Sequence, residues 1–241
     1  MCRALAVRHC EGFPQRCALR GWREAGRAGP AIRDRRHWCA PSYLGKTAAE
    51  RVAERRERLI DAGVELFDER GYAAASIRSV LQQSGLRDRY FGESFADLDS
   101  LLAAVYSRLI DEEISGCAAV IDKTSGGSES TRAMIDTITR SFEKNPGKAR
   151  IKSREVLSGG PVAREQRRAG LRRLAQLVAD LLPASTALNR SDVLLLGLSI
   201  VAAADELLLT WMDSAEGLTR DRVVDVVTLL FDATAHHISS T

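Results

Sequence analysis

Apolar residues recur every three to four positions from residue 47 onward, which is the spacing of one face of an α-helix. Thr47 is followed three residues later by Glu50, which predicts a capping box at a helix start, and Gly71 predicts the end of the same helix. The pattern therefore predicts a first helix between Thr47 and Gly71. Its apolar stripe consists of Val52, Leu59, Ile60, Gly63, Leu66 and Phe67.

Shorter helices are predicted directly after the first. Ser76 is a suitable N-cap ahead of a second apolar stripe, and Gly85 predicts the end of that short helix. The stretch SGLRDRYFGESF, residues 84–95, contains a third helix, and Asp97 is placed to cap a long fourth helix with a leucine-rich face. Two helices joined by a tight glycine turn are typical of a helix-turn-helix.

The remainder of the chain also has helical periodicity, so the predicted fold class is all-α. The last two predicted helices are the most apolar, and such a pair often packs against a second copy of the chain. The alternative is that the pair forms the interior of one domain. The polar side of the helix that starts at Pro161 is expected to carry Arg164, Arg167, Arg168, Arg172 and Arg173. These helices are expected over residues 128–144, 148–157, 161–182, 191–214 and 218–237.

Charge is distributed unevenly along the 241 residues, whose formal net charge is +3. Residues 1–46 hold ten Lys and Arg against three acidic residues, a net of +7, so the remainder carries a net of −4. This tail is rich in Gly, Pro and Arg without helical or strand periodicity, which predicts disorder. Two interpretations remain open: a basic arm that binds nucleic acid, or an extension upstream of the true gene start. We favour the second.

The sequence contains none of the patterns typical of common enzymes or metal sites. It has no HExxH motif, no nucleophile elbow and no phosphate-binding loop, so we expect no enzymatic activity and no cofactor. His236 and His237 have no acidic or Cys companion at ligand spacing, which argues against a metal site there. The tail cysteines match no paired zinc pattern and are expected to be unligated thiols: Cys2, Cys10, Cys17 and Cys39.

No feature of the sequence indicates export or membrane insertion. The longest apolar run, residues 193–204, has twelve residues, whereas a bilayer span needs about 20. The N-terminus lacks the apolar segment of a secretory signal. We therefore expect a cytoplasmic protein without a membrane partner.

The helix-turn-helix region resembles that of TetR-family transcriptional regulators. The resemblance rests on LIDAGVELFDERGY (residues 59–72), Ser76 at the start of the second helix, SGL before the third, and Phe95 ten residues after Gly85. Further along, DELLLTWMDSAEGLT followed by VVDVVTLLF resembles the closing helix pair of the family. The resemblance covers about residues 47–240. It implies a homodimeric DNA-binding protein, usually a repressor, that a small ligand releases from a palindromic operator on double-stranded DNA.

The resemblance also implies how the chain is divided. Residues 47–95 would be the helix-turn-helix DNA-binding domain and residues 96–241 a helical ligand-binding and dimerisation domain, preceded by the Arg-rich tail of residues 1–46, whose composition predicts disorder. The homodimer would form through the last two helices. The ligand is expected to be a small apolar or amphipathic molecule.

The expected DNA contacts follow from the docking of a helix-turn-helix, whose third helix places its N-terminal residues at base edges in the major groove. An arginine there can pair bidentately with guanine, which is worth about 1–3 kcal/mol of discrimination. The start of the second helix would meet phosphate. Phe91 and Phe95 are expected in the core. The predicted DNA-contacting residues are Ser76, Arg78, Arg87, Asp88, Arg89, Tyr90 and Glu93.

Three positions depart from the family pattern. Gly92 stands where the family usually has an aromatic residue that contacts phosphate, Leu98 replaces a lysine, and Arg87 replaces a serine. Residues 47–95 also hold eight arginines against nine acidic residues, a net of −1, which weakens phosphate binding unless the tail helps. The alternative function is therefore a degenerate ligand-binding or dimerisation module with weak or no autonomous DNA binding.

Candidate ligand-binding residues are polar or amphipathic side chains within apolar stretches of the C-terminal part. An apolar cavity with a few polar groups is the usual form of such a site. The candidates are Asp136, Arg154, Glu155, Glu206 and Trp211.

Overall fold

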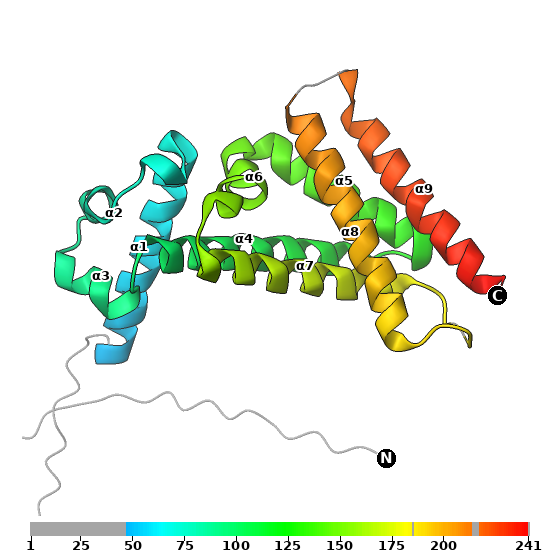
Figure 1. Ribbon diagram of the computed structural model, residues 1–241, viewed down its shortest axis with the longest axis horizontal. Coiled ribbons are helices and arrows are strands. Elements are labelled where there is room, and N and C mark those ends of the chain that lie inside the picture. Colours follow the sequence, from blue (N-terminus) through cyan, green and yellow to red (C-terminus); the bar gives the residue numbers. More distant parts are fainter. Residues whose placement is uncertain (1–46, 185, 214–216, 241) are drawn as a thin grey trace, which may run out of the picture. The chain divides into compact units, whose positions relative to one another are not determined.

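The computed structural model describes residues 47–184, 186–213 and 217–240, and within them all regular structure is helical (Figure 1). The all-α fold class predicted from the sequence is therefore confirmed. Two 3-10 turns, η1 (Tyr72–Ala74) and η2 (Glu155–Ser158), connect longer elements. The α-helices are α1 (Ala48–Arg70), α2 (Ile77–Ser84), α3 (Asp88–Ser94), α4 (Leu98–Ile121), α5 (Gly127–Lys144), α6 (Pro146–Ser153), α7 (Pro161–Leu181), α8 (Arg190–Met212) and α9 (Arg220–Ser239).

The capping residues predicted around the helix-turn-helix are present in the structure. Thr47 and Glu50 form the reciprocal capping box of α1. Ser76 caps α2 and Asp97 caps α4 through their side-chain oxygens. Gly85 ends α2 with φ 65°, a left-handed conformation that glycine adopts without steric cost and that turns the chain toward α3. Local capping signals thus set the boundaries of the helix-turn-helix.

One predicted helix, over residues 148–157, is divided in the structure. The helix α6 begins earlier, at Pro146, because proline suits the first helical turn, where its missing N–H would have no partner. It ends at Ser153, since Arg154 has φ −120° and ψ −55°, and the turn η2 follows. The predicted single helix was therefore wrong in both its start and its continuity.

An apolar core joins α1, α2 and α3 to α4. Phe91 of α3 and Leu101 of α4 both belong to it, so the helix-turn-helix packs directly on the helix that leads away from it. Val52, which the sequence placed on the buried stripe of α1, is 41% exposed. That placement was wrong because the buried apolar residues of α1 begin only at Leu59. The domain boundary between residues 95 and 96 stays a prediction.

A second core forms where α5, α7, α8 and α9 meet, yet α8 and α9, which lie side by side in Figure 1, leave apolar surface uncovered. Leu195 of α8 is 59% exposed and Leu229 of α9 is 67% exposed. The 23 residues of α8 suffice, by length and composition alone, to cross a membrane. Only 17% of its most apolar 18-residue stretch is buried. The twelve-residue apolar run noted in the sequence is thus part of a longer apolar helix. Packing of α8 on α7 nevertheless makes it a member of the helical bundle.

Candidate functional site

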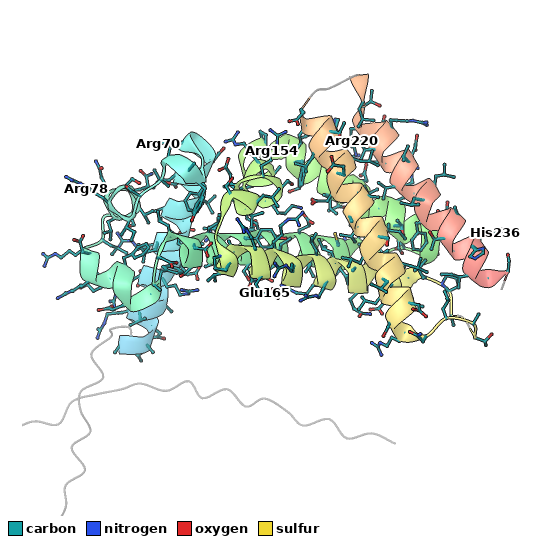
Figure 2. All side chains as sticks on the ribbon, in the orientation of Figure 1. Arg70, Arg78, Arg154, Glu165, Arg220 and His236 are labelled. Atoms are coloured by element: carbon teal, nitrogen blue, oxygen red, sulfur yellow. The ribbon has the colours of Figure 1, made fainter. Side chains whose placement is uncertain are left out.

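The helix-turn-helix presents exposed positive side chains on α2 and at the start of α3. Arg78 of α2, marked in Figure 2, and Arg87 just before α3 are both exposed. Within the described residues neither side chain makes an ion pair or hydrogen bond. Ser76 is exposed, and its hydroxyl is engaged in capping α2 by accepting from the amide of Ser79 at 3.1 Å. Asp88 is exposed in the first turn of α3, where the helix dipole favours a negative charge.

The middle of α3 is tied to α1 through Tyr90. The guanidinium groups of Arg55 and Arg89 lie 4.4 and 4.6 Å from the centroid of the Tyr90 ring. Arg89 also donates a 2.6 Å hydrogen bond to the Tyr90 hydroxyl, which lowers the pKa of Tyr90. Glu93 pairs with Arg55 at 3.2 Å. These exposed contacts contribute little to stability, but they restrict the rotamers of Arg89 and Tyr90.

Two further arginines of α1 hold the ends of the shorter helices. Arg56 donates to the carbonyl of Ser94 at 2.9 Å, and Arg58 donates to the carbonyl of Ser84 at 2.6 Å. Each cation satisfies a carbonyl at a helix C-terminus, where the helix dipole favours positive charge. The arginines of α1 are therefore partly committed to positioning α2 and α3, which reduces the charge that remains available for another partner.

Gly92 and Leu98, the two departures flanking the end of α3, have different surroundings. Gly92 is exposed, and a Cβ added there would meet none of the described residues within 4 Å. Leu98 is half-buried and packs against the core that α4 shares with the helix-turn-helix. Packing therefore explains a leucine at position 98, whereas nothing in the surroundings requires a glycine at position 92.

The C-terminal helices enclose a small apolar cavity of about 60 Å³. Residues from α4, α5, α6, α7, α8 and α9 line it, and most of them are aliphatic. This volume is the space open to the centres of water molecules, of which one water needs about 10–15 Å³, so a guest larger than a few such groups would extend beyond the cavity or displace the helices around it. The aliphatic lining consists of Ile110, Met134, Ile135, Ile138, Leu171, Leu174, Val178, Ile200, Val201, Ala204, Leu208 and Val227.

The charged residues in the wall of this cavity form two ion pairs. Lys152 of α6 donates to Glu113 of α4, and their side chains are only 9% and 10% exposed. Arg167 of α7 pairs with Asp205 of α8 at 2.8 Å. Arg167 was expected on the exposed polar side of its helix, but its side chain is 24% exposed because it turns toward α8. Both pairs join different helices, so they restrain the helices around the cavity.

The helix α6 connects this cavity with α1. Lys152 faces the cavity, while Arg150 on the same helix pairs with Asp68 of α1 at 3.0 Å. Gly147 lies so close to α1 that an added Cβ would overlap the Asp68 carboxylate. Displacement of α6 by a guest in the cavity would therefore disturb the contact between α6 and α1.

Comparisons with known proteins show which fold this arrangement of helices belongs to. No family model matches the chain. The HTH-type transcriptional activator FasR of Mycolicibacterium smegmatis is 22% identical over 172 residues, which cover 71% of this chain and 78% of the relative. A putative TetR-family transcriptional regulator from Syntrophomonas wolfei superposes with a TM-score of 0.60 at 19% identity, covering 76% of this chain and 95% of that one. The chain has the TetR fold. The transcriptional regulator FadR from Bacillus subtilis, solved with stearoyl-CoA, superposes with a TM-score of 0.60 at 16% identity, covering 73% of this chain and 97% of that one.

Within this TetR fold, two predicted ligand residues lie in surface ion pairs rather than in the cavity wall. Asp136 of α5 accepts from Arg140 and from Arg220, and the hydrogen bond from Arg140 lowers the pKa of Asp136. Arg154 is exposed and pairs with Asp213 just after α8. Figure 2 marks Arg154 and Arg220.

The other three predicted ligand residues are also outside the main cavity and apart from one another. Glu155 accepts a 2.7 Å hydrogen bond from the amide of Tyr72, which ties η2 to η1. Glu206 is exposed on α8. Trp211 lines a separate shallow depression with Phe142 and neighbouring residues. The structure therefore does not bring the five predicted residues together.

The charged residues that do line the cavity are ones that the sequence did not single out as ligand-binding residues. Glu113 and Lys152 are 39 positions apart, and Arg167 and Asp205 are 38 apart, so no local motif links them. Asp205 did carry a signal, because it lies on the same helical face as Ala204, Val201 and Leu208 of the cavity wall. Asp205 thus lies on the side of α8 that faces the cavity, whereas its neighbour Glu206 is exposed.

Proposed function

We propose that this chain is a DNA-binding transcriptional regulator that acts as a homodimer and responds to a small ligand. The observation that carries the proposal is the exposed face of α2 and α3, with Arg78 and Arg87 unpaired within the described residues. Arg56 and Arg58 hold the frame of that face rigidly against α1. A rigidly held α3 that begins with Arg87, unpaired within the described residues, suits base readout in the major groove. The predicted DNA contacts keep the same residues: Ser76, Arg78, Arg87, Asp88, Arg89, Tyr90 and Glu93.

Titration of fluorescent duplexes from the region upstream of its own gene tests DNA binding. We expect salt-dependent binding with a preferred sequence, reduced about 5- to 150-fold by Arg87→Ala because one bidentate base contact is lost. Arg164→Ala, an exposed arginine on α7, is the charge-matched control and should leave the affinity unchanged. No binding even at low salt would contradict the proposal and leave the alternative of a ligand-binding or dimerisation module. The committed arginines of α1 and the net charge of −1 over residues 47–95 are the observations that favour that alternative.

The ligand-responsive part of the proposal rests on the cavity and on α6. Lys152 in the cavity wall and Arg150 at the contact with α1 belong to one short helix, so a guest that moves α6 would alter the position of α1. We therefore propose that ligand binding lowers DNA affinity, which makes the protein a repressor released by its ligand. The relative named FasR is an activator, so activation is the second candidate. A reporter fused to the bound promoter separates them, because deletion of the regulator raises expression in the first case and lowers it in the second.

A further inference from the structure

The charges around the cavity cancel one another completely within the described residues of its wall. Its lining contains two cations, Lys152 and Arg167, and two anions, Glu113 and Asp205. Each cation is already paired with one anion across a helix contact. The site therefore has no spare charge to offer a ligand.

The first pair is the more deeply buried and has the less room to reorganise. Lys152 and Glu113 are about nine-tenths buried, and the Lys152 ammonium also lies 4.5 Å from the centroid of the Phe142 ring. A second cavity of about 160 Å³ adjoins this pair, with Glu113, Lys152 and Ile138 common to both walls. The pair therefore lies between two spaces, and a ligand in either one would touch it.

A charged ligand at this place would have to break a pair. An anion that took Lys152 would leave Glu113 buried without a partner, and a cation that took Glu113 would do the same to Lys152. Removing one partner of a buried ion pair is strongly destabilising because an uncompensated charge remains in a poorly solvated place. An uncharged ligand avoids this cost, since it can occupy the apolar space and leave both pairs intact.

The wall does offer one hydrogen-bond donor with little present use. Among the described residues, the Tyr106 hydroxyl makes a single long hydrogen bond, 3.5 Å, to the carbonyl of Arg167. Burial raises the pKa of Tyr106, so the hydroxyl keeps its proton and remains a donor at all physiological pH values. An oxygen atom on an otherwise aliphatic ligand could accept a hydrogen bond from this hydroxyl.

We propose that the effector of this chain is an uncharged, mainly aliphatic molecule with a hydrogen-bond acceptor for Tyr106, selected by a cavity whose wall charges are all internally paired. The inference rests on the ligand-responsive part of the proposed function and adds the chemical class of the ligand. It follows that the ion pairs disfavour the binding of charged amphiphiles and do not bind a charged headgroup of the ligand.

Three probes with the same eight-carbon chain test the charge preference in the full-length protein. Binding of octan-1-ol, octanoate and octylammonium is measured by isothermal titration calorimetry without DNA. We expect octan-1-ol to bind at least about tenfold more tightly than either ion, because each ion leaves one buried charge unpaired. Ala204→Phe, which fills the cavity from α8, should abolish binding of the alcohol.

Breaking the buried pair from either side should change the preference in opposite directions. Glu113→Gln leaves Lys152 without its carboxylate and should favour octanoate, whereas Lys152→Met should favour octylammonium. The double variant Glu113→Gln/Lys152→Met removes both charges and should restore the preference for octan-1-ol. Far-UV circular dichroism and thermal unfolding verify that each variant is folded. If a single variant does not fold, the relative affinities of the three probes for the wild type test the proposal.

Octanoate or octylammonium binding to the wild type as tightly as octan-1-ol would overturn the proposal. So would binding of the alcohol that survives Ala204→Phe, or the absence of any binding. None of these outcomes affects DNA binding by the free protein, so failure of the ligand class and failure of the regulator assignment remain distinguishable.

Discussion

At the scale of single residues, Gly92 is the position where the chain departs most clearly from what its local structure favours. A glycine in the middle of α3 costs about 1 kcal/mol relative to alanine, and the open space around it shows no packing reason for that cost. Glycine is therefore not required by the fold. The resemblance to TetR-family regulators instead implies that the position lacks an aromatic contact to phosphate.

Two substitutions at Gly92 separate helix stability from DNA contact. Gly92→Ala should raise the free energy of unfolding by about 0.5–1 kcal/mol without a large change in DNA affinity, because only helix propensity changes. Gly92→Tyr should in addition tighten DNA binding by about two- to tenfold, the effect of one new hydrogen bond to phosphate. Chemical denaturation and duplex titration provide the two measurements. Equal DNA affinity of the Ala and Tyr variants would show that position 92 does not face the phosphate backbone.

At the scale of elements, α6 connects the cavity of the C-terminal helices with α1 of the helix-turn-helix. It is short, it begins with a proline, and it contacts both α1 and α4. Its close approach to α1 depends on Gly147, where a side chain would overlap Asp68. A single helix thus carries both a cavity residue and the contact to the helix-turn-helix.

Substitution of Gly147 tests that communication. In Gly147→Ala either Asp68 turns away from Arg150 or α6 shifts from α1, so we expect DNA affinity to fall severalfold without ligand. The loss of stability should stay within about 1 kcal/mol, because the Asp68–Arg150 pair is largely exposed. Gly116→Ala on α4 is the matched control, since its Cβ would only reach ordinary contact with Thr137 at 3.6 Å. Identical DNA affinity of both variants would argue against a role of the α1–α6 contact.

Elements also show where sequence reasoning succeeded and where it stopped. The starts of α1, α2 and α4 and the ends of α1 and α2 were predicted because their signals, a cap residue or a glycine, lie within a few positions of the boundary. The division between α6 and η2 was not, because no strong breaker stands at Arg154. In α8 the carboxylate within the apolar stretch was recognised as unusual, but the neighbour Glu206 was chosen in place of Asp205.

At the scale of the whole molecule, the uncovered apolar surface of α8 and α9 supports the proposed homodimer. An apolar surface on two adjacent helices suits self-association into a bundle shared by two copies. Leu229 is the most exposed large apolar residue among the described helices. A dimer would cover this surface and place two helix-turn-helix units against two half-sites of DNA.

Charge substitution at Leu229 tests this interface. Leu229→Glu should convert the dimer to a monomer, measured by sedimentation equilibrium, and should weaken binding to a palindromic duplex at least about tenfold because two linked half-site contacts are lost. Leu157→Glu is the matched control, because Leu157 is 47% exposed but lies on η2. A Leu229→Glu protein that remains dimeric would place the interface elsewhere.

By itself, the sequence determined the all-α class, the helix-turn-helix boundaries, the apolar character of the last two helices and the resemblance to TetR-family regulators. These properties depend on periodicity and capping, which act over a few residues along the chain. Only the tertiary structure decided which charged residues line the cavity, that their charges cancel, and that α6 links the cavity to α1. Those features join residues tens of positions apart, such as Glu113 with Lys152 and Asp68 with Arg150, whose approach depends on packing of whole helices.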